Sequence, residues 1–182
     1  MEFTTEQQEL EVPGRYALWL VPEASAEERL ISVIEDLSDR YGCPRFLPHA
    51  TILGGLGGTE QELIEKVDSL AGELQAIDVT ATGLAMEPYY FTSFYLKLEP
   101  SAALLLSYQK ATQIFTAKAG NFNPHVSLLY GSVPRQEKIN IGAEIHSRVP
   151  GAFRLDRLYL VQITLAVPNW KVISRHDLPS AD

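Results

Sequence analysis

The chain contains one cysteine, Cys43, among 182 residues, and it lacks any apolar run long enough to cross a membrane. A single cysteine cannot form an internal disulfide, so a disulfide-stabilised fold is excluded. A membrane-spanning helix needs roughly 18 or more consecutive apolar residues. Residues 1–9 are polar and acidic, whereas a signal peptide would be basic and then apolar. We therefore expect a cytoplasmic protein without a membrane partner.

Positive charge is also scarce, because 15 Lys and Arg face 23 Asp and Glu and leave a net charge of −8. A protein that wraps long nucleic acid needs a basic surface, so we expect no such partner. A small anion held by local donors remains compatible with this charge. With 46% hydrophobic residues the chain can bury a real core. We expect one monomeric domain, 1–182, with a polar arm at 1–13 and a tail at 178–182.

Hydrophobic periodicity predicts strands and helices in irregular alternation. Ser25 and Thr59 each open a capping-box pattern that predicts the start of a helix. Further helices are expected at about 102–117 and 134–147, and strands at about 15–21, 77–86, 90–98, 124–130, 152–166 and 170–177. The order strand, helix, strand, helix, strand occurs twice. It predicts an α+β, bilobed fold, with two antiparallel β-sheets flanked by helices and pseudo-two-fold symmetry around a central groove.

One tetrapeptide recurs in the two halves of the chain. Pro48-His49-Ala50-Thr51 returns 76 positions later as Pro124-His125-Val126-Ser127. Composition alone does not readily explain a repeat that includes the proline. Side chains two apart on a strand point to the same face, so each copy presents one imidazole beside one hydroxyl. Two such strands facing each other would place two imidazoles and two hydroxyls around one cleft.

These residue types favour acid–base chemistry on a bound anion. Two histidines make a poor metal site, since catalytic zinc usually has three protein ligands, and we expect neither metal nor cofactor. One neutral and one protonated imidazole would supply a general base and a general acid. The hydroxyls of Thr51 and Ser127 lack the arrangement of a nucleophilic triad and suit hydrogen bonding to an oxyanion. Together the four side chains predict a phosphate site.

The paired motifs, the opening strand Tyr16-Ala17-Leu18-Trp19-Leu20-Val21-Pro22 and the run His125-Val126-Ser127-Leu128-Leu129-Tyr130 resemble the two-histidine phosphoesterase superfamily, cyclic phosphodiesterase branch, over roughly residues 14–177. The resemblance implies a metal-independent enzyme for small cyclic phosphates from tRNA splicing. It would open ADP-ribose 1″,2″-cyclic phosphate to the 1″-phosphate, or nucleoside 2′,3′-cyclic phosphates to the 2′-phosphate.

The resemblance also implies residue roles. His49 and His125 become the catalytic pair, and Thr51 and Ser127 bind the non-bridging phosphate oxygens. We hypothesise that His125 activates water and His49 protonates the leaving oxygen. Tyr130 is a candidate for placing phosphate or water, with a strand-end structural role as the alternative. Trp19 is a candidate for stacking on a base, with a core position as the alternative.

Three alternatives stay open from the sequence. The same fold could process RNA ends, as tRNA-ligase-like phosphodiesterases and exonucleases do, or it could bind a nucleotide or short RNA without turnover. Arg45 could contact a second phosphate, although a solvated loop position is the default. The aromatic residues between 89 and 95 could wall the cleft, although strand aromatics are more often core.

Overall fold

A computed structural model describes residues 15–163 and 167–180. The predicted polar arm at 1–13 lies outside the described residues, as does the end of the predicted tail, 181–182. No helix in these two described segments is both long and apolar enough to span a bilayer. The elements in chain order are β1 Tyr16–Pro22, α2 Ala24–Tyr41, β2 Ala50–Leu56, α3 Glu60–Ala71, β3 Ile77–Met86, β4 Phe94–Leu98, α4 Ala102–Ile114, β5 His125–Leu129, α5 Arg135–Ile145, β6 Ala152–Gln162, η1 Val167–Asn169 and β7 Lys171–Asp177.

The strands form a hydrogen-bonded path in the order β2-β1-β6-β3-β4-β5, with β7 paired to β6. All pairs are antiparallel. Exchanging β1 with β4, β2 with β5 and β3 with β6 gives the same path read from its other end, as a pseudo-two-fold relation requires. The predicted bilobed α+β fold is therefore confirmed. Its two sheets are continuous through β3, because residues 77–80 pair with β6 and residues 81–86 pair with β4.

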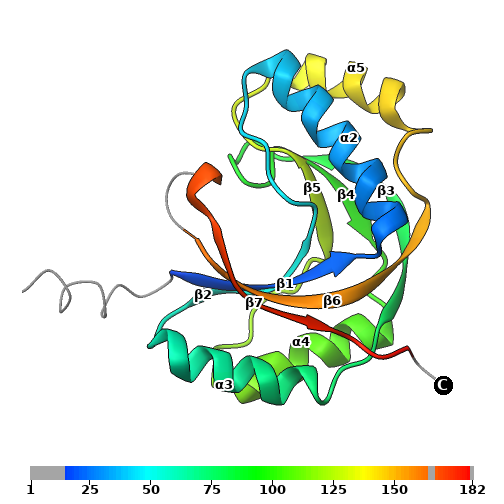
Figure 1. The fold of residues 1–182 in the computed structure, drawn as a ribbon. Coiled ribbons are helices and arrows are strands. Elements are labelled where there is room, and N and C mark those ends of the chain that lie inside the picture. The colour runs from blue at the N-terminus through cyan, green and yellow to red at the C-terminus, as the bar shows by residue number, and fades with distance from the viewer. Residues whose placement is uncertain (1–14, 164–166, 181–182) are drawn as a thin grey trace, which may run out of the picture.

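The helices cross between the two halves. Figure 1 shows α2 beside α5 at one end of the molecule and α3 beside α4 at the other. Helix α2 follows β1 in the chain but contacts β5, and α4 follows β4 but contacts β2. Each motif strand is thus covered by a helix from the opposite half, which ties the two halves into one packed body.

Alternation along β1 decides which face of the sheet meets the helices. Leu18 and Leu20 belong to the large core shared with the helices, whereas Ala17, Trp19 and Val21 belong to a separate apolar cluster. Successive strand residues point to opposite faces, so the second set lines the face that the helices leave uncovered. That face carries the cavity described below.

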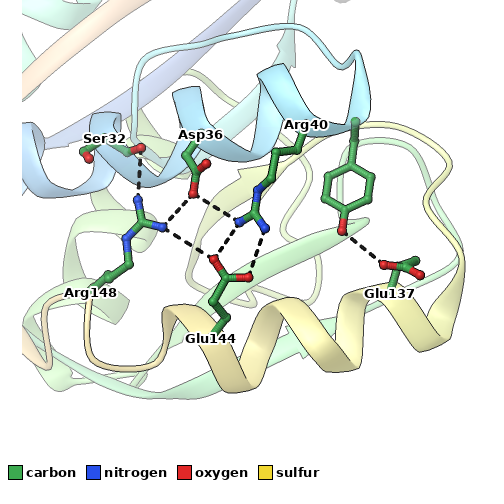
Figure 2. A network of polar contacts seen from close by, with 7 residues as sticks. Ser32, Asp36, Arg40, Glu137, Glu144 and Arg148 are labelled. Atoms are coloured by element: carbon green, nitrogen blue, oxygen red, sulfur yellow. Dashed lines mark hydrogen bonds and ion pairs between the residues drawn. The ribbon is translucent and has the colours of Figure 1, made fainter.

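Surface ion pairs join α2 to α5 and to the segment that follows it (Figure 2). Arg40 donates two hydrogen bonds to Glu144, at 2.9 and 3.0 Å, and Arg148 donates to Asp36 at 2.6 Å. The hydrogen bond from Arg148 holds the pKa of the Asp36 carboxyl below its usual value. These side chains are partly exposed, so each pair contributes at most about 1 kcal/mol. Their role is to fix the position of α5 on α2.

Two local predictions have opposite outcomes. The capping box at Thr59 is confirmed, because its hydroxyl accepts from the Glu62 N–H and the Glu62 carboxylate accepts from the Thr59 N–H. The cap at Ser25 is wrong. Helix α2 already begins at Ala24, and its N-cap, Glu23, makes no side-chain cap hydrogen bond. Pro22 closes the strand directly before it, which leaves no room for a longer connection.

The strand expected at 90–98 begins only at Phe94. Residues 87–93 instead form a loop, here called the β3–β4 loop, in which the Glu87 N–H donates to the Thr92 carbonyl. This difference matters for the site, because the loop carries aromatic side chains out of the core.

Candidate active site

One cavity of about 260 Å³ brings the two halves of the sequence together. All six residues singled out from the sequence line it. The lining residues are Ala17, Trp19, His49, Thr51, Gly54, Phe91, Thr92, His125, Ser127, Tyr130, Ile163 and Trp170. Their catalytic and binding roles remain predictions, but the residues that carry them share one surface.

Strand register explains how the motif residues reach this cavity. In the first half Trp19 of β1 lies opposite Thr51 of β2. In the second half Tyr95 of β4 lies opposite Ser127 of β5, at the symmetry-equivalent position. Directly opposed residues point to the same face of a sheet. Each half therefore presents an aromatic ring beside its hydroxyl.

Each imidazole is held by a hydrogen bond between its Nδ1 and the backbone carbonyl oxygen two residues earlier. His49 Nδ1 lies 2.6 Å from the carbonyl oxygen of Leu47, and His125 Nδ1 lies 2.8 Å from that of Asn123. A carbonyl oxygen only accepts, so Nδ1 carries the hydrogen in both rings. This leaves Nε2 of each histidine as the atom that can exchange a proton with a ligand.

The surroundings of the two rings differ. His49 is only 6% exposed, and its ring stacks on Trp19 with centroids 3.6 Å apart and planes 9° apart. Burial lowers the pKa of His49 to about 4, against the opposing effect of the Leu47 hydrogen bond and with a smaller contribution from the charge of His125. His125 is half-buried, and its ring lies at 4.8 Å and 56° from that of Tyr95. The structure thus holds His49 neutral at physiological pH.

The predicted anion donors also differ between the halves. Thr51 is exposed to the cavity, whereas Ser127 is buried and donates to the Phe91 carbonyl at 3.1 Å. Ser127 also hydrogen-bonds the Tyr130 hydroxyl, and burial raises the pKa of that phenol. Tyr130 stacks on Phe46 with centroids 3.8 Å apart. Its ring is fixed in place and its hydroxyl stays protonated.

Trp19 lines the cavity, but it is 3% exposed and one face of its ring is covered by His49. That geometry favours support of the imidazole over the predicted stacking on a base. Arg45 does not line this cavity. Its guanidinium is held by Asp39 at 2.7 and 2.8 Å and by Glu35 at 3.3 Å.

Two further aromatic residues line the cavity. Phe91 belongs to the aromatic residues between 89 and 95 that the sequence offered as a possible wall of the cleft, whereas Trp170 was not predicted. Phe91 is 48% exposed, because the β3–β4 loop lifts it out of the sheet in which it was expected. Trp170 follows η1, and its ring lies 6.1 Å from that of Phe91 with planes 27° apart. The run Tyr89-Tyr90-Phe91 after Pro88 was the available signal, since exposed turn aromatics are unusual without a ligand or partner.

No group of three or more His, Cys, Asp or Glu side chains within residues 15–163 and 167–180 is placed to bind a metal ion. Every Lys and Arg of the chain falls in these two segments, and none of the 15 lines the cavity. An anion in the cavity would therefore meet hydroxyls, imidazoles and aromatic rings.

Among solved structures, the similarity concerns the fold. The crystal structure of Escherichia coli LigT in apo form covers 93% of this chain and 100% of its own, with a TM-score of 0.62 and 13% identity. At that identity the likeness shows the fold alone. It agrees with the two-histidine phosphoesterase architecture implied by the paired motifs.

Sequence comparisons then place the chain more closely. The family model described as cyclic phosphodiesterase-like protein matches residues 15–178. A cyclic phosphodiesterase of Arabidopsis thaliana is 27% identical over 150 residues, which is 80% of this chain and 83% of that protein. A 2′,3′-cyclic-nucleotide 3′-phosphodiesterase of Phaeosphaeria nodorum is 24% identical over 196 residues, 92% of this chain and all of that protein.

The chain belongs to the cyclic phosphodiesterase-like family. The predicted superfamily and its cyclic phosphodiesterase branch are confirmed, and with them the prediction of a phosphodiester hydrolase.

Proposed function

We propose that this protein hydrolyses small cyclic phosphates by acid–base catalysis between His49 and His125, without a metal ion. The observation that carries the proposal is the shared cavity, in which both Nε2 atoms are left free by backbone bonds at Nδ1. Histidine pairs with different environments suit a reaction that needs one proton acceptor and one proton donor. The hydroxyls beside the rings suit the non-bridging oxygens.

The environments of the two rings favour a direction opposite to the one hypothesised from the sequence. His49 is held neutral by burial, so its Nε2 accepts the proton of the attacking water. The new P–O bond forms as the P–O bond to one ribose oxygen breaks. His125, the more exposed ring, donates its Nε2 proton to that oxygen. The product is a phosphomonoester and a free ribose hydroxyl.

The hydroxyls complete the site. Thr51 donates to one non-bridging oxygen without rearrangement, since it faces the cavity. Ser127 first exchanges its bond to the Phe91 carbonyl for a bond to the other oxygen. Tyr130, held by its stacking on Phe46, supports Ser127 through their shared hydrogen bond.

The substrate class follows from size and charge. Ligand pockets for drug-sized molecules span roughly 300–1,000 Å³, so this cavity suits one cyclic phosphate with its sugar. We propose nucleoside 2′,3′-cyclic phosphates opened to 2′-phosphates, and ADP-ribose 1″,2″-cyclic phosphate opened to the 1″-phosphate. The name of the Phaeosphaeria relative supports cleavage of the 3′ bond. An RNA polymer is disfavoured, because no Lys or Arg side chain lines the cavity.

The test is turnover of 2′,3′-cyclic AMP in the presence of a chelator, with the product isomer identified by phosphorus NMR. We expect the 2′-phosphate from the wild type, and a loss of at least about a hundredfold in kcat for His49→Gln and His125→Gln, as is typical for general acid–base groups. His146→Gln is the matched control, because His146 is exposed and lies outside the cavity. Near-normal turnover in either motif variant, or activity abolished by the chelator, would refute the proposal.

A further inference from the structure

The two halves support their histidines by different means. Trp19 and Tyr95 occupy equivalent positions, each opposite the hydroxyl residue of its motif. Trp19 stacks flat on its histidine, whereas Tyr95 is tilted by 56° against His125 at 4.8 Å. Stacking on Trp19 fixes the plane of His49 in addition to its hydrogen bond with the Leu47 carbonyl. The tilted Tyr95 ring does not fix the plane of His125 by stacking. A second restraint is therefore needed, and the hydrogen bonds of the Tyr95 hydroxyl supply it.

Tyr95 connects the partly buried carboxylate of Glu87 to the residue that holds His125. Its hydroxyl donates to Glu87 Oε1 at 3.1 Å and also hydrogen-bonds the Asn123 side chain. The backbone carbonyl of Asn123 accepts from His125 Nδ1 at 2.8 Å. Tyr95 is only 4% exposed, and burial, together with Glu87, raises the pKa of its phenol. A protonated phenol therefore links Glu87 to Asn123 at neutral pH.

Glu87 is itself held from several directions. Its second carboxylate oxygen accepts from the Thr92 hydroxyl at 2.7 Å. Its backbone carbonyl accepts from Lys138 Nζ of α5 at 3.0 Å, and the same ammonium donates to the Ser93 carbonyl at 3.1 Å. Lys138 is 6% exposed. Helix α5 thus clamps both ends of the β3–β4 loop, and the Glu87 carboxylate has little freedom to leave Tyr95.

We propose that Glu87 and Tyr95 are positioning residues for His125, acting through Asn123. The inference rests on the proposed function in assigning His125 as the proton donor. Once the imidazole has given up its Nε2 proton, it must keep the hydrogen on Nδ1 so that Nε2 can be reprotonated for the next turnover. The Asn123 carbonyl enforces this tautomer only while it faces Nδ1. Tyr95 and Glu87 hold Asn123 in that orientation.

Steady-state kinetics on 2′,3′-cyclic AMP test the proposal. Tyr95→Phe keeps the ring and removes the hydroxyl, and we expect kcat to fall about tenfold with KM within about twofold of wild type. Glu87→Ala should likewise lower kcat and leave KM nearly unchanged. Glu87→Gln should recover most of kcat, because its amide oxygen still accepts from Tyr95. Tyr41→Phe is the matched control. It deletes a hydroxyl that donates to Glu137 of α5 at 3.3 Å, and neither residue lines the cavity, so kcat should not change.

A second readout does not depend on turnover. The imidazole ¹H–¹⁵N spectrum of the wild type should show His125 as the Nδ1–H tautomer with slow proton exchange. Tyr95→Phe should give mixed tautomers or faster exchange for His125, with the His49 signals unchanged. An unchanged His125 spectrum in Tyr95→Phe and Glu87→Ala overturns the proposal, as does a loss confined to KM. If the wild type opens no cyclic phosphate, the proposed function fails while the spectrum still decides the positioning role.

Discussion

Burial of His49 makes folding stability depend on pH in a way that can be measured directly. The pKa of this imidazole is about 4 in the folded protein against 6.5 for the free side chain. The unfolded chain therefore binds more protons between these values, and stability falls as pH falls through that window. One unit of pKa is worth 1.36 kcal/mol, so the group should remove about 3 kcal/mol of stability between pH 7 and pH 4.

The assay is urea unfolding of wild type and His49→Asn at pH 7, 6, 5 and 4. Asparagine retains a donor for the Leu47 carbonyl and does not titrate. Other groups contribute equally to both proteins, so the difference between their free energies of unfolding isolates His49. We expect that difference to shift by about 3 kcal/mol against the wild type from pH 7 to pH 4.

A matched substitution separates the buried histidine from histidines in general. His146→Asn alters an exposed side chain at the end of α5, and its difference from wild type should stay nearly constant across the same range. A difference between wild type and His49→Asn that does not change with pH would refute the reasoning. It would mean that the ring is solvated or paired in solution, and the assignment of His49 as the neutral base would lose its support.

Two further predictions concern Trp170, which lines the cavity, and Gly131, which follows the lining residue Tyr130 in the chain. Trp170→Ala removes a ring whose centroid lies 6.1 Å from that of Phe91. It should raise KM for 2′,3′-cyclic AMP about tenfold or more with kcat nearly unchanged, because base stacking is worth about 1–3 kcal/mol. An unchanged KM would show that the base lies elsewhere. Gly131→Ala should lower the free energy of unfolding by about 1–3 kcal/mol, because φ is +116° there and a Cβ would lie 3.0 Å from Cys43 Sγ. Gly151 has open space around it, so Gly151→Ala is the control and should leave the melting temperature nearly unchanged.

Much of the site could be predicted because its signals are local. The paired Pro-His-x-(Thr/Ser) motifs contain the two imidazoles, the two hydroxyls and the strand alternation that places them on one face. The capping box at Thr59 and the hydrophobic periodicity of the helices are likewise properties of a few neighbouring residues. Such features require no knowledge of distant contacts.

Other features depend on residues that are far apart in the chain. The strand expected at 90–98 is shortened because the β3–β4 loop is held by Lys138 of α5 and by Ser127 of β5, neither of which the local sequence reveals. The helix start at Ala24 depends on where β1 must end beside β6. Trp170 enters the cavity only because β7 pairs with β6 and brings it there.

The amino-acid sequence by itself determined the pair of reacting groups, their hydroxyl neighbours and the family to which the chain belongs. Tertiary structure decided how the two histidines differ. The two motifs have the same pattern of residues. In the structure, however, the His49 ring is buried against Trp19, whereas the His125 ring is hydrogen-bonded to Asn123, which in turn contacts Tyr95. Proton affinity is set by burial and by neighbours brought from other strands, and these exist only once the chain has folded.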